Sequence, residues 1–249
     1  MKTNSKQRSV RIISEIHPQH HGSMSEIKRM VLQSKIGGAD AVKVQLYSSK
    51  NIWGDESRDY ISITKPELKE IDEYCKIIGI DLSASVFDYE KLDWCEEINL
   101  KFYKIASRTV KEDVDLCKRI IDLKKETIIS LGMYDWKNGF PFEGNNIKYL
   151  YCVSNYPTQL TDLKFPEFSK NNFYGYSDHT IGISAPMFAV AKVFAAISPV
   201  VIFVSAIRLP HPIVDLFRSI HTKDCLQMDF LSHNLRLNPR PGLFHSRYK

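Results

Sequence analysis

The sequence predicts an α/β protein of the (β/α)8 or TIM-barrel type, in which eight parallel strands alternate with helices. Apolar segments rich in Val and Ile alternate with segments of helical periodicity from Val10 to about Val204, which is typical of a parallel sheet with crossover helices. Eight such strands in 249 residues agree with the size of one barrel. Pro199 and the weak helical periodicity after it predict an imperfect last βα unit.

Each expected strand is a short run of mostly β-branched, aliphatic or aromatic residues. The expected strands are Val10–Ile13, Ala41–Gln45, Ile80–Ser85, Phe102–Ile105, Thr127–Ser130, Tyr149–Val153, Asn172–Tyr174 and Val200–Val204.

The first three helices are predicted from the spacing of apolar residues and from end signals. The first begins near Ser25. The second begins with a capping box and an early proline at Thr64–Glu67 and stops at Gly79. A third runs from Asp88 to about Ile98.

Two further helices complete the prediction. A capping box at Thr109–Glu112 predicts one helix from Val110 to Leu123. An apolar helix is expected from Ala185 to Ala196. The cysteines on the helical stripes are expected in the core; they are Cys75, Cys95 and Cys117.

Composition narrows the class of protein. The chain is 43% hydrophobic and 25% charged, as in an ordinary globular protein. Its five cysteines are widely spaced and include no CxxC pair, which favours a reducing compartment. The sequence shows no secretory signal and no apolar run of membrane-spanning length, so we expect a cytoplasmic protein.

The net charge of +5 is concentrated near the end of the chain. From residue 206 onward there are seven Lys or Arg against three Asp. The rest of the chain is close to neutral and predicts no basic face of the kind that binds nucleic acid.

The octet Gly175–Gly182 concentrates polar side chains between an expected strand and an expected helix. It places Ser177, Asp178, His179 and Thr180 in four consecutive positions. Helix capping needs only one of them. Because loops at strand ends carry functional side chains on a rigid scaffold, the octet predicts part of an active-site rim.

The other strand ends are polar as well. They carry Glu15, Lys43, Gln45, Ser83, Ser85, Lys104, Ser107, Ser130, Ser154, Tyr156, Ser177 and His179. Two lysines among so many hydroxyl groups predict a pocket for a phosphate and a carboxylate.

Four of these segments together resemble the N-acetylneuraminate (sialic acid) synthase family. They are Ala39–Gln45, Lys104–Ser107, Cys152–Thr158 and Ser177–Gly182, and the similarity extends over about residues 10–192. Members of that family are (β/α)8 barrels that condense phosphoenolpyruvate with an N-acetylhexosamine to give a nonulosonic acid and phosphate.

The resemblance implies roles for individual residues. It assigns phosphoenolpyruvate to Lys104, Ser107, Ser130, Ser154 and Ser177, with Ser85 also in substrate binding. It places Glu15, Lys43, Gln45 and Tyr156 toward the sugar, with Glu15, Lys43 and Tyr156 as the catalytic residues. It makes His179 one of two histidines that bind Mn²⁺ or Mg²⁺, and that metal would polarise the open-chain aldehyde.

Three departures from the family pattern qualify these expectations. The first loop reads Gln19–Gly22 where the family usually has Asn-His-Asn-Gly. Thr109 stands where the family usually has a glutamate near the aldehyde. The second metal histidine is expected in an Ile-Glu-x-His-Phe strand about twenty residues after His179, but that region reads Ile197–Val201. We therefore expect weak metal binding.

The expected domain organisation is a synthase-type barrel over residues 1–205 and a divergent basic tail over residues 206–249. The change in composition suggests the hypothesis that the tail is read in a shifted frame. No segment resembles the antifreeze-like domain that follows the barrel in the family, so the homodimer usual in the family is not expected to form normally.

Two other interpretations remain open. One is a Schiff-base aldolase with Lys104 or Lys43 as nucleophile. The other is a catalytically impaired barrel remnant or scaffold, which the missing metal histidine favours. His17, His20 and His21 are not expected to form a metal cluster, because adjacent side chains diverge on a strand.

Overall fold

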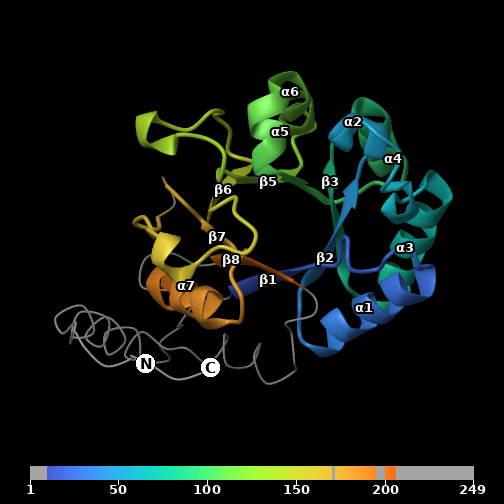
Figure 1. The fold of residues 1–249 in the computed structure, drawn as a ribbon, viewed down its shortest axis with the longest axis horizontal. Coiled ribbons are helices and arrows are strands. Elements are labelled where there is room, and N and C mark those ends of the chain that lie inside the picture. Colours follow the sequence, from blue (N-terminus) through green and yellow to red (C-terminus); the bar gives the residue numbers. More distant parts are fainter. Residues whose placement is uncertain (1–9, 170–171, 195–199, 206–249) are drawn as a thin grey trace, which may run out of the picture.

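Eight parallel strands form a closed barrel in the computed structural model, which describes residues 10–169, 172–194 and 200–205 (Figure 1). The strands are β1 (Val10–Glu15), β2 (Ala41–Leu46), β3 (Asp81–Val86), β4 (Phe102–Ile105), β5 (Glu126–Ser130), β6 (Ile147–Cys152), β7 (Gly175–Ser177) and β8 (Val200–Ser205). Each strand pairs with the next along the chain, and β8 pairs with both β7 and β1. The predicted (β/α)8 barrel is confirmed, and its eighth strand is fully integrated into the sheet.

Helices and short turns connect the strands around the outside of the barrel (Figure 1). The helices are α1 (Met24–Ile36), α2 (Ser49–Trp53), α3 (Lys65–Ile78), α4 (Tyr89–Glu97), α5 (Ser107–Glu112), α6 (Val114–Asp122) and α7 (Ser184–Phe194). Single 3-10 turns lie at Asp59–Ile61, Trp136–Asn138 and Leu160–Asp162. Within the described ranges, none of these helices has the length and apolar character needed to cross a membrane.

The second predicted helix illustrates how local sequence sets these boundaries. At the start of α3, Thr64 and Glu67 form the expected capping box, and proline occupies the first turn. Gly79 ends the helix in a left-handed conformation with φ of 71°. The buried stripe of α3 includes Cys75, and Cys95 and Cys117 are also buried on their helices, as predicted.

The predicted helix from Val110 to Leu123 is wrong in its start and continuity. Helix α5 already begins at Ser107, so Thr109 lies inside it and forms no capping box. The chain breaks at Asp113, where φ is −142°, and the Asp113 side chain accepts a hydrogen bond from the Leu116 N–H to cap α6. An aspartate suited to capping therefore divides what periodicity alone presents as one helix.

The boundaries around the octet also shift. The seventh strand is Gly175–Ser177 rather than Asn172–Tyr174, while Phe173 forms only an isolated bridge with Phe168. Helix α7 begins at Ser184, close to the predicted position. Its predicted last residues and the tail from residue 206 lie outside the described residues.

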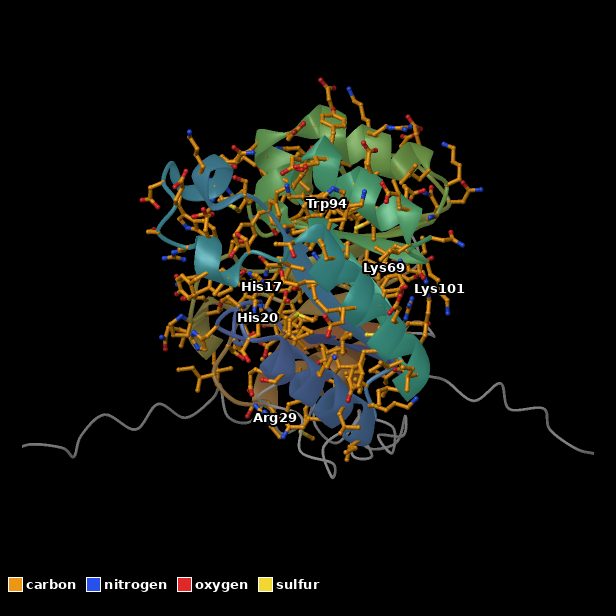
Figure 2. All side chains as sticks on the ribbon, turned by 90° about the vertical axis from the view of Figure 1, so that its right-hand side faces the viewer. His17, His20, Arg29, Lys69, Trp94 and Lys101 are labelled. Atoms are coloured by element: carbon orange, nitrogen blue, oxygen red, sulfur yellow. The ribbon has the colours of Figure 1, made fainter. Side chains whose placement is uncertain are left out.

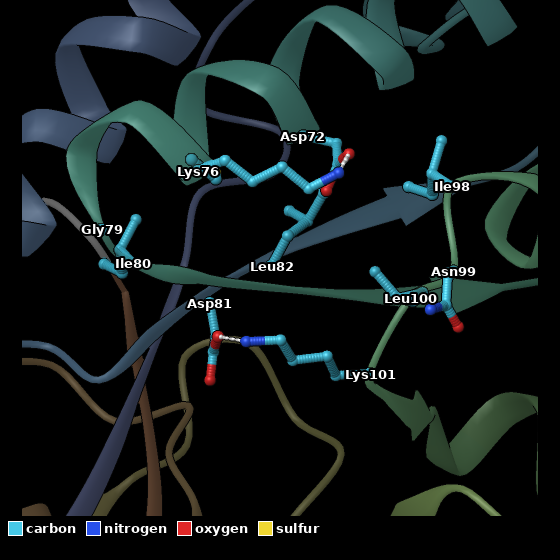
Figure 3. Close-up of a pocket in the computed structure, with 11 residues that line it drawn as sticks. Asp72, Lys76, Gly79, Ile80, Asp81, Leu82, Ile98, Asn99, Leu100 and Lys101 are labelled. Carbon is cyan, nitrogen blue, oxygen red and sulfur yellow. Dashed lines mark hydrogen bonds and ion pairs between the residues drawn. The ribbon is translucent and has the colours of Figure 1, made fainter.

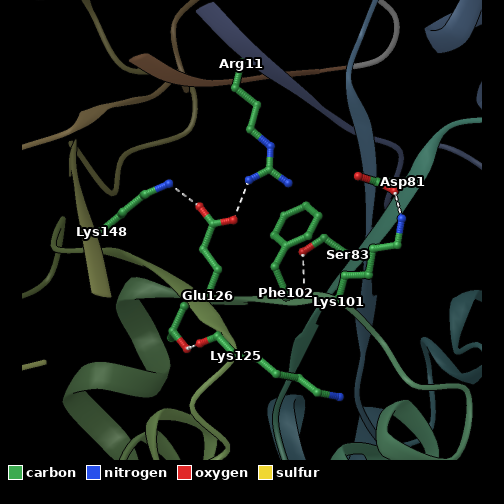
Figure 4. Close-up of polar contacts among 9 residues, drawn as sticks. Arg11, Asp81, Ser83, Lys101, Phe102, Lys125, Glu126 and Lys148 are labelled. Carbon is green, nitrogen blue, oxygen red and sulfur yellow. Dashed lines mark hydrogen bonds and ion pairs between the residues drawn. The ribbon is translucent and has the colours of Figure 1, made fainter. Parts of the chain in front are cut away.

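The barrel interior is arranged in layers, because alternate residues of each strand point inward. The middle layer is an apolar cluster of Ile13, Ala41, Phe102, Ile128 and Leu150. Two residues earlier on the strands, a polar layer contains Arg11, Glu126 and Lys148 (Figure 4). Two residues later lie Glu15, Lys43, Lys104, Ser130 and Cys152, at the carboxyl ends of the strands.

Candidate active site

The carboxyl ends of the strands gather the residues that the sequence singles out. Strand register pairs Glu15 with Lys43 and Gln45 with Ser85, and it pairs Cys152 with Ser177 across β6 and β7. The layer that we call the upper polar layer comprises Glu15, Lys43, Gln45, Ser85, Lys104, Ser130, Cys152 and Ser177. Ser107, Ser154, Tyr156 and His179 follow directly on the connecting segments.

One side of the upper polar layer is an ion pair between β1 and β2. The Lys43 ammonium contacts the Glu15 carboxylate and donates a 3.3 Å hydrogen bond to Ser85 Oγ. Glu15 also accepts from Gln45 Nε2 at 3.2 Å and from the backbone N–H of His17 at 3.1 Å. The carboxylate is therefore held by three donors and oriented by two strands.

Lys104 lies near this ion pair and is almost completely buried, with 4% of its surface exposed. Its ammonium donates to the backbone carbonyl of Ile105 at 2.8 Å. Burial, reinforced by the positive charge of Lys43, lowers the pKa of Lys104 to about 7. The pair of lysines gives this part of the layer an excess of positive charge that an anion would stabilise.

The opposite side is a close-packed group of hydroxyls around the Cys152 thiol. Ser107 Oγ lies 3.9 Å from Cys152 Sγ and accepts a 2.9 Å hydrogen bond from the Gly132 N–H. A side chain at Gly132 would come within 2.4 Å of Ser154 Oγ, so only glycine permits this approach. The Ser154 and Ser177 hydroxyls also bond to the thiol, while burial raises the pKa of Cys152.

Ser130 differs from these hydroxyls. Its Oγ is buried and has no hydrogen-bond partner among the described residues. An unsatisfied buried hydroxyl is costly in a folded protein and is commonly explained by a ligand or water. Thr109, which occupies the position of the family's glutamate, likewise has a buried Oγ without a described partner.

Tyr156 and His179 meet above the layer. Their rings lie 4.0 Å apart, and Tyr156 is 74% exposed at the barrel mouth. His179 Nδ1 lies 2.7 Å from the carbonyl of Val153, which can only accept, so Nδ1 carries the proton in the neutral ring. His179 Nε2 then accepts the hydrogen bond from the Tyr156 hydroxyl at 2.8 Å.

Asp178, between Ser177 and His179, accepts hydrogen bonds that stabilise the local turn. Its Oδ1 accepts from the Thr180 N–H at 2.9 Å, from the Thr180 hydroxyl at 2.7 Å and from the Tyr176 hydroxyl at 3.0 Å. The carboxylate thus fixes the turn that presents His179.

The divalent metal that the family resemblance implies does not fit the described donors. The Nε2 of His179 is engaged by Tyr156, and no group of three or more His, Cys, Asp or Glu that could hold an ion occurs among the described residues. Strand β8 brings Phe203 into register with Ser177, and from Val200 to Val204 its residues are all apolar. A single imidazole does not make a site that retains Mn²⁺ or Mg²⁺.

A separate shallow pocket of about 360 Å³ lies at the ends of α3 and α4, beside the starts of β3 and β4 (Figure 3). Its charges are already paired, Lys76 with Asp72 at 2.5 Å and Lys101 with Asp81 at 2.6 Å. It contains none of the predicted site residues, so we place the candidate site at the other end of the barrel.

A family model provides the deciding comparison. The model of the NeuB family matches residues 30–195, which is more than half of the chain and includes both lysines of the upper polar layer. The chain belongs to the NeuB family. Glu15 and β8 lie outside the matched residues, so the contacts of Glu15 rest on the structure alone.

Individual relatives agree with membership of the NeuB family. An uncharacterized protein from Methanocaldococcus jannaschii is 32% identical over 72% of this chain and 58% of its own length. N,N'-diacetyllegionaminic acid synthase from Legionella pneumophila is 30% identical over 72% of this chain and 60% of its own length. This NeuB chain therefore spans about three fifths of the length of these relatives.

A solved structure supports the fold. The N-acetylneuraminic acid synthetase of Leptospira borgpetersenii, solved with citrate, superposes with a TM-score of 0.67 over 95% of this chain and 88% of that one, at 22% identity.

Three features of this NeuB barrel escape prediction from the sequence. The Cys152 thiol lies at the centre of the cluster of serine hydroxyls. Its position two residues after the inward-facing Leu150 is the sequence signal that predicts an inward-facing side chain. Gly132 is evident only from its contacts. The third feature, a hydrogen bond between His17 and Tyr47, joins loops that are distant in sequence.

Proposed function

We propose that this protein condenses phosphoenolpyruvate with an N-acetylhexosamine-type sugar to form a nonulosonic acid and inorganic phosphate. The observation that carries the proposal is the pair of buried lysines, Lys43 and Lys104, in one layer with hydroxyl groups. Buried cations and oriented hydroxyls provide the donors that bind a phosphate and a carboxylate. Relatives named as synthases of sialic, legionaminic and pseudaminic acids support the same class of product.

In the proposed reaction, the enol carbon of phosphoenolpyruvate forms a carbon–carbon bond with the aldehyde carbon of the open-chain sugar. The aldehyde oxygen takes up a proton, and water adds to the cation left at the phosphate-bearing carbon. Phosphate then leaves as the carbon–oxygen bond breaks. Donors that stabilise charge on the phosphate and on the new alkoxide lower the barrier.

The proposed roles are those that the family resemblance implies, and the contacts of the described residues support them. Lys104, Ser107, Ser130, Ser154 and Ser177 would hold phosphoenolpyruvate, with Ser85 beside Lys43. Glu15, Lys43 and Gln45 would form the floor of the sugar site. Tyr156, which is hydrogen-bonded to His179 at the mouth, would exchange a proton with the sugar.

An assay of phosphate release tests the proposal. Purified protein is incubated with phosphoenolpyruvate and N-acetylmannosamine or N-acetylglucosamine, and Ser177→Ala serves as the impaired variant. Sugar-dependent release that falls in this variant supports the function. Absence of any phosphoenolpyruvate binding by calorimetry contradicts it.

Metal binding is a separate proposal: we expect Mn²⁺ to bind His179 weakly. Because one imidazole is the ligand and Tyr156 competes for it, electron paramagnetic resonance of added Mn²⁺ should show mostly free ion at micromolar protein. Tight Mn²⁺ binding that is lost in His179→Ala contradicts this expectation.

A Schiff-base aldolase is the second candidate, favoured by one observation. The pKa of Lys104 is lowered to about 7 by burial, so a large fraction of its amine is unprotonated and nucleophilic at neutral pH. Borohydride treatment with pyruvate traps an imine on Lys104 only if this alternative is correct.

A catalytically impaired barrel is the third candidate, supported by the apolar β8 strand. Binding of phosphoenolpyruvate without turnover of either sugar would favour it.

A further inference from the structure

Two hydrogen bonds cross between β1 and β2 at the barrel mouth, one above the other. The lower is Gln45 to Glu15, at 3.2 Å. The upper joins His17 Nε2 and the Tyr47 hydroxyl at 2.9 Å. His17 lies two residues after Glu15, just beyond the end of β1, and Tyr47 lies two residues after Gln45, just beyond the end of β2.

The direction of the upper hydrogen bond follows from its neighbours. The backbone N–H of Gly22 donates to His20 Nδ1 at 3.0 Å, so this nitrogen carries no proton. The neutral His20 ring therefore holds its proton on Nε2 and donates to His17 Nδ1, 2.9 Å away. His17 in turn donates from Nε2 to the Tyr47 oxygen.

The chain of donors leaves the phenol proton of Tyr47 directed away from His17. Among the described residues, His17 is the only hydrogen-bond partner of the Tyr47 hydroxyl. The phenol can donate to a second group while accepting from the imidazole. All ring nitrogens of His17 and His20 are engaged in the chain, so these two histidines offer no site for a metal.

Packing holds the chain in place. His17, His20 and Tyr47 are all buried, and His17 and His20 lie side by side (Figure 2). The Tyr47 ring packs edge-on against Trp53 of α2, with centroids 4.8 Å apart. Gly22 lies so close to the Tyr60 carbonyl that a side chain there would clash at 1.9 Å. These contacts hold the β1–α1 loop against the segment that connects β2 to α3.

We propose that Tyr47 is a specificity-determining donor of the sugar subsite, and that His17 and His20 are positioning residues that orient its hydroxyl. The ligand class is a neutral acceptor oxygen, a hydroxyl or an N-acetyl carbonyl of the sugar. This inference rests on the proposed function, because it assigns one wall of the same pocket. It places the acceptor contact next to His17, whose backbone N–H donates to Glu15.

The central test compares Tyr47→Phe with Tyr103→Phe. Both remove a phenol oxygen from a buried side chain, but Tyr103 donates to Glu96, away from the upper polar layer. We expect Tyr47→Phe to weaken binding of N-acetylmannosamine or N-acetylglucosamine about tenfold in a binary titration, with phosphoenolpyruvate affinity unchanged. Tyr103→Phe should change neither affinity. Unchanged sugar affinity in Tyr47→Phe overturns the proposal.

The positioning role has its own readout. Nitrogen-15 NMR should show protons on Nε2 of both His17 and His20, and Tyr47→Phe should shift the Nε2 resonance of His17. His17→Leu removes the donor to Tyr47 and should reproduce most of the loss of sugar affinity, whereas His17→Gln retains a side-chain donor and should restore part of it. The opposite tautomer at His17, or equal effects of Leu and Gln, contradicts the orienting role.

These outcomes separate the inference from the proposed function. Wild-type protein that binds phosphoenolpyruvate but neither sugar contradicts the Tyr47 subsite while leaving the phosphate site intact. Protein that binds neither phosphoenolpyruvate nor sugar contradicts the proposed function, and the subsite with it.

Discussion

The two polar layers of the barrel contain the same kinds of charge and differ in burial. At the amino ends of the strands, Glu126 bridges Arg11, at 2.6 Å, and Lys148 (Figure 4). At the carboxyl ends, Glu15 contacts Lys43, with Lys104 close by. Each layer has two cations and one carboxylate.

The difference in burial distinguishes the layer at the amino ends, which we call the lower layer and interpret as structural, from the upper polar layer, which is the candidate site. Side chains of the lower layer are 22–28% exposed, and Arg11 also stacks on Phe102 at 4.0 Å. In the upper layer, Lys104 is nearly inaccessible to solvent, and its ammonium donates a hydrogen bond to the backbone carbonyl of Ile105. Solvent reaches the charges of the lower layer, whereas burial in the upper layer favours a bound anion as the counter-charge of the second lysine.

The largest difference between the layers is expected for removal of one lysine from each. Lys104→Met should weaken phosphoenolpyruvate binding roughly 10–150-fold, because a charge-assisted contact contributes about 1.5–3 kcal/mol. Lys148→Met, which removes the corresponding cation of the lower layer, should leave the affinity unchanged. Calorimetry measures both, and equal affinities of Lys104→Met and wild type would remove the basis for the phosphate assignment.

Burial also predicts a pH dependence that only the upper layer should show. Burial lowers the pKa of Lys104 to about 7, so its ammonium is progressively lost as the pH rises above 7. Binding of the anion must then be coupled to uptake of one proton from solvent by Lys104, and affinity for phosphoenolpyruvate should fall about tenfold per pH unit between pH 7.5 and 9. Titrations in buffers of different ionisation enthalpy should show proton uptake.

Lys104→Arg is the matched control for this pH dependence. An arginine stays protonated throughout the range, so any remaining affinity should be independent of pH. A wild-type affinity that does not change between pH 7.5 and 9 contradicts the lowered pKa of Lys104.

The fold and the composition of the candidate site could be predicted from the sequence, since each depends on local patterns. The positions of Glu15, Lys43 and Lys104 at the ends of the expected strands point to one site, and the strand register brings Glu15 and Lys43 together. The break at Asp113 was missed because capping competes with helical periodicity. The Tyr156–His179 and His17–Tyr47 contacts depend on how loops pack across the barrel mouth, which no spacing along the chain reveals.

A third prediction concerns stability of the lower layer. Glu126→Gln should lower the free energy of unfolding by about 1–2 kcal/mol, because it leaves Arg11 and Lys148 partly buried without their carboxylate. Their remaining exposure to solvent keeps the effect below that of a fully buried pair. Denaturant unfolding measures the change, and phosphoenolpyruvate affinity should stay as in wild type. A large loss of affinity would show that the two layers are not independent.

The smallest expected effect compares two serines inside the same barrel. Ser83 Oγ donates to the Phe102 carbonyl at 3.3 Å, whereas Ser130 Oγ is buried without a described partner. Ser83→Ala should therefore lower the free energy of unfolding by about 0.5–1.5 kcal/mol and leave phosphoenolpyruvate affinity unchanged. Ser130→Ala should be neutral or slightly stabilising, since it removes a hydroxyl that the unliganded fold leaves unsatisfied. The same change should weaken phosphoenolpyruvate binding about three- to tenfold, because the lost hydroxyl is then a ligand contact. A Ser130→Ala protein that is as stable as wild type or more stable, but binds phosphoenolpyruvate more weakly, would identify Ser130 as a binding residue that does not contribute to stability. A variant that is less stable but binds phosphoenolpyruvate as tightly as wild type would instead assign Ser130 a structural role.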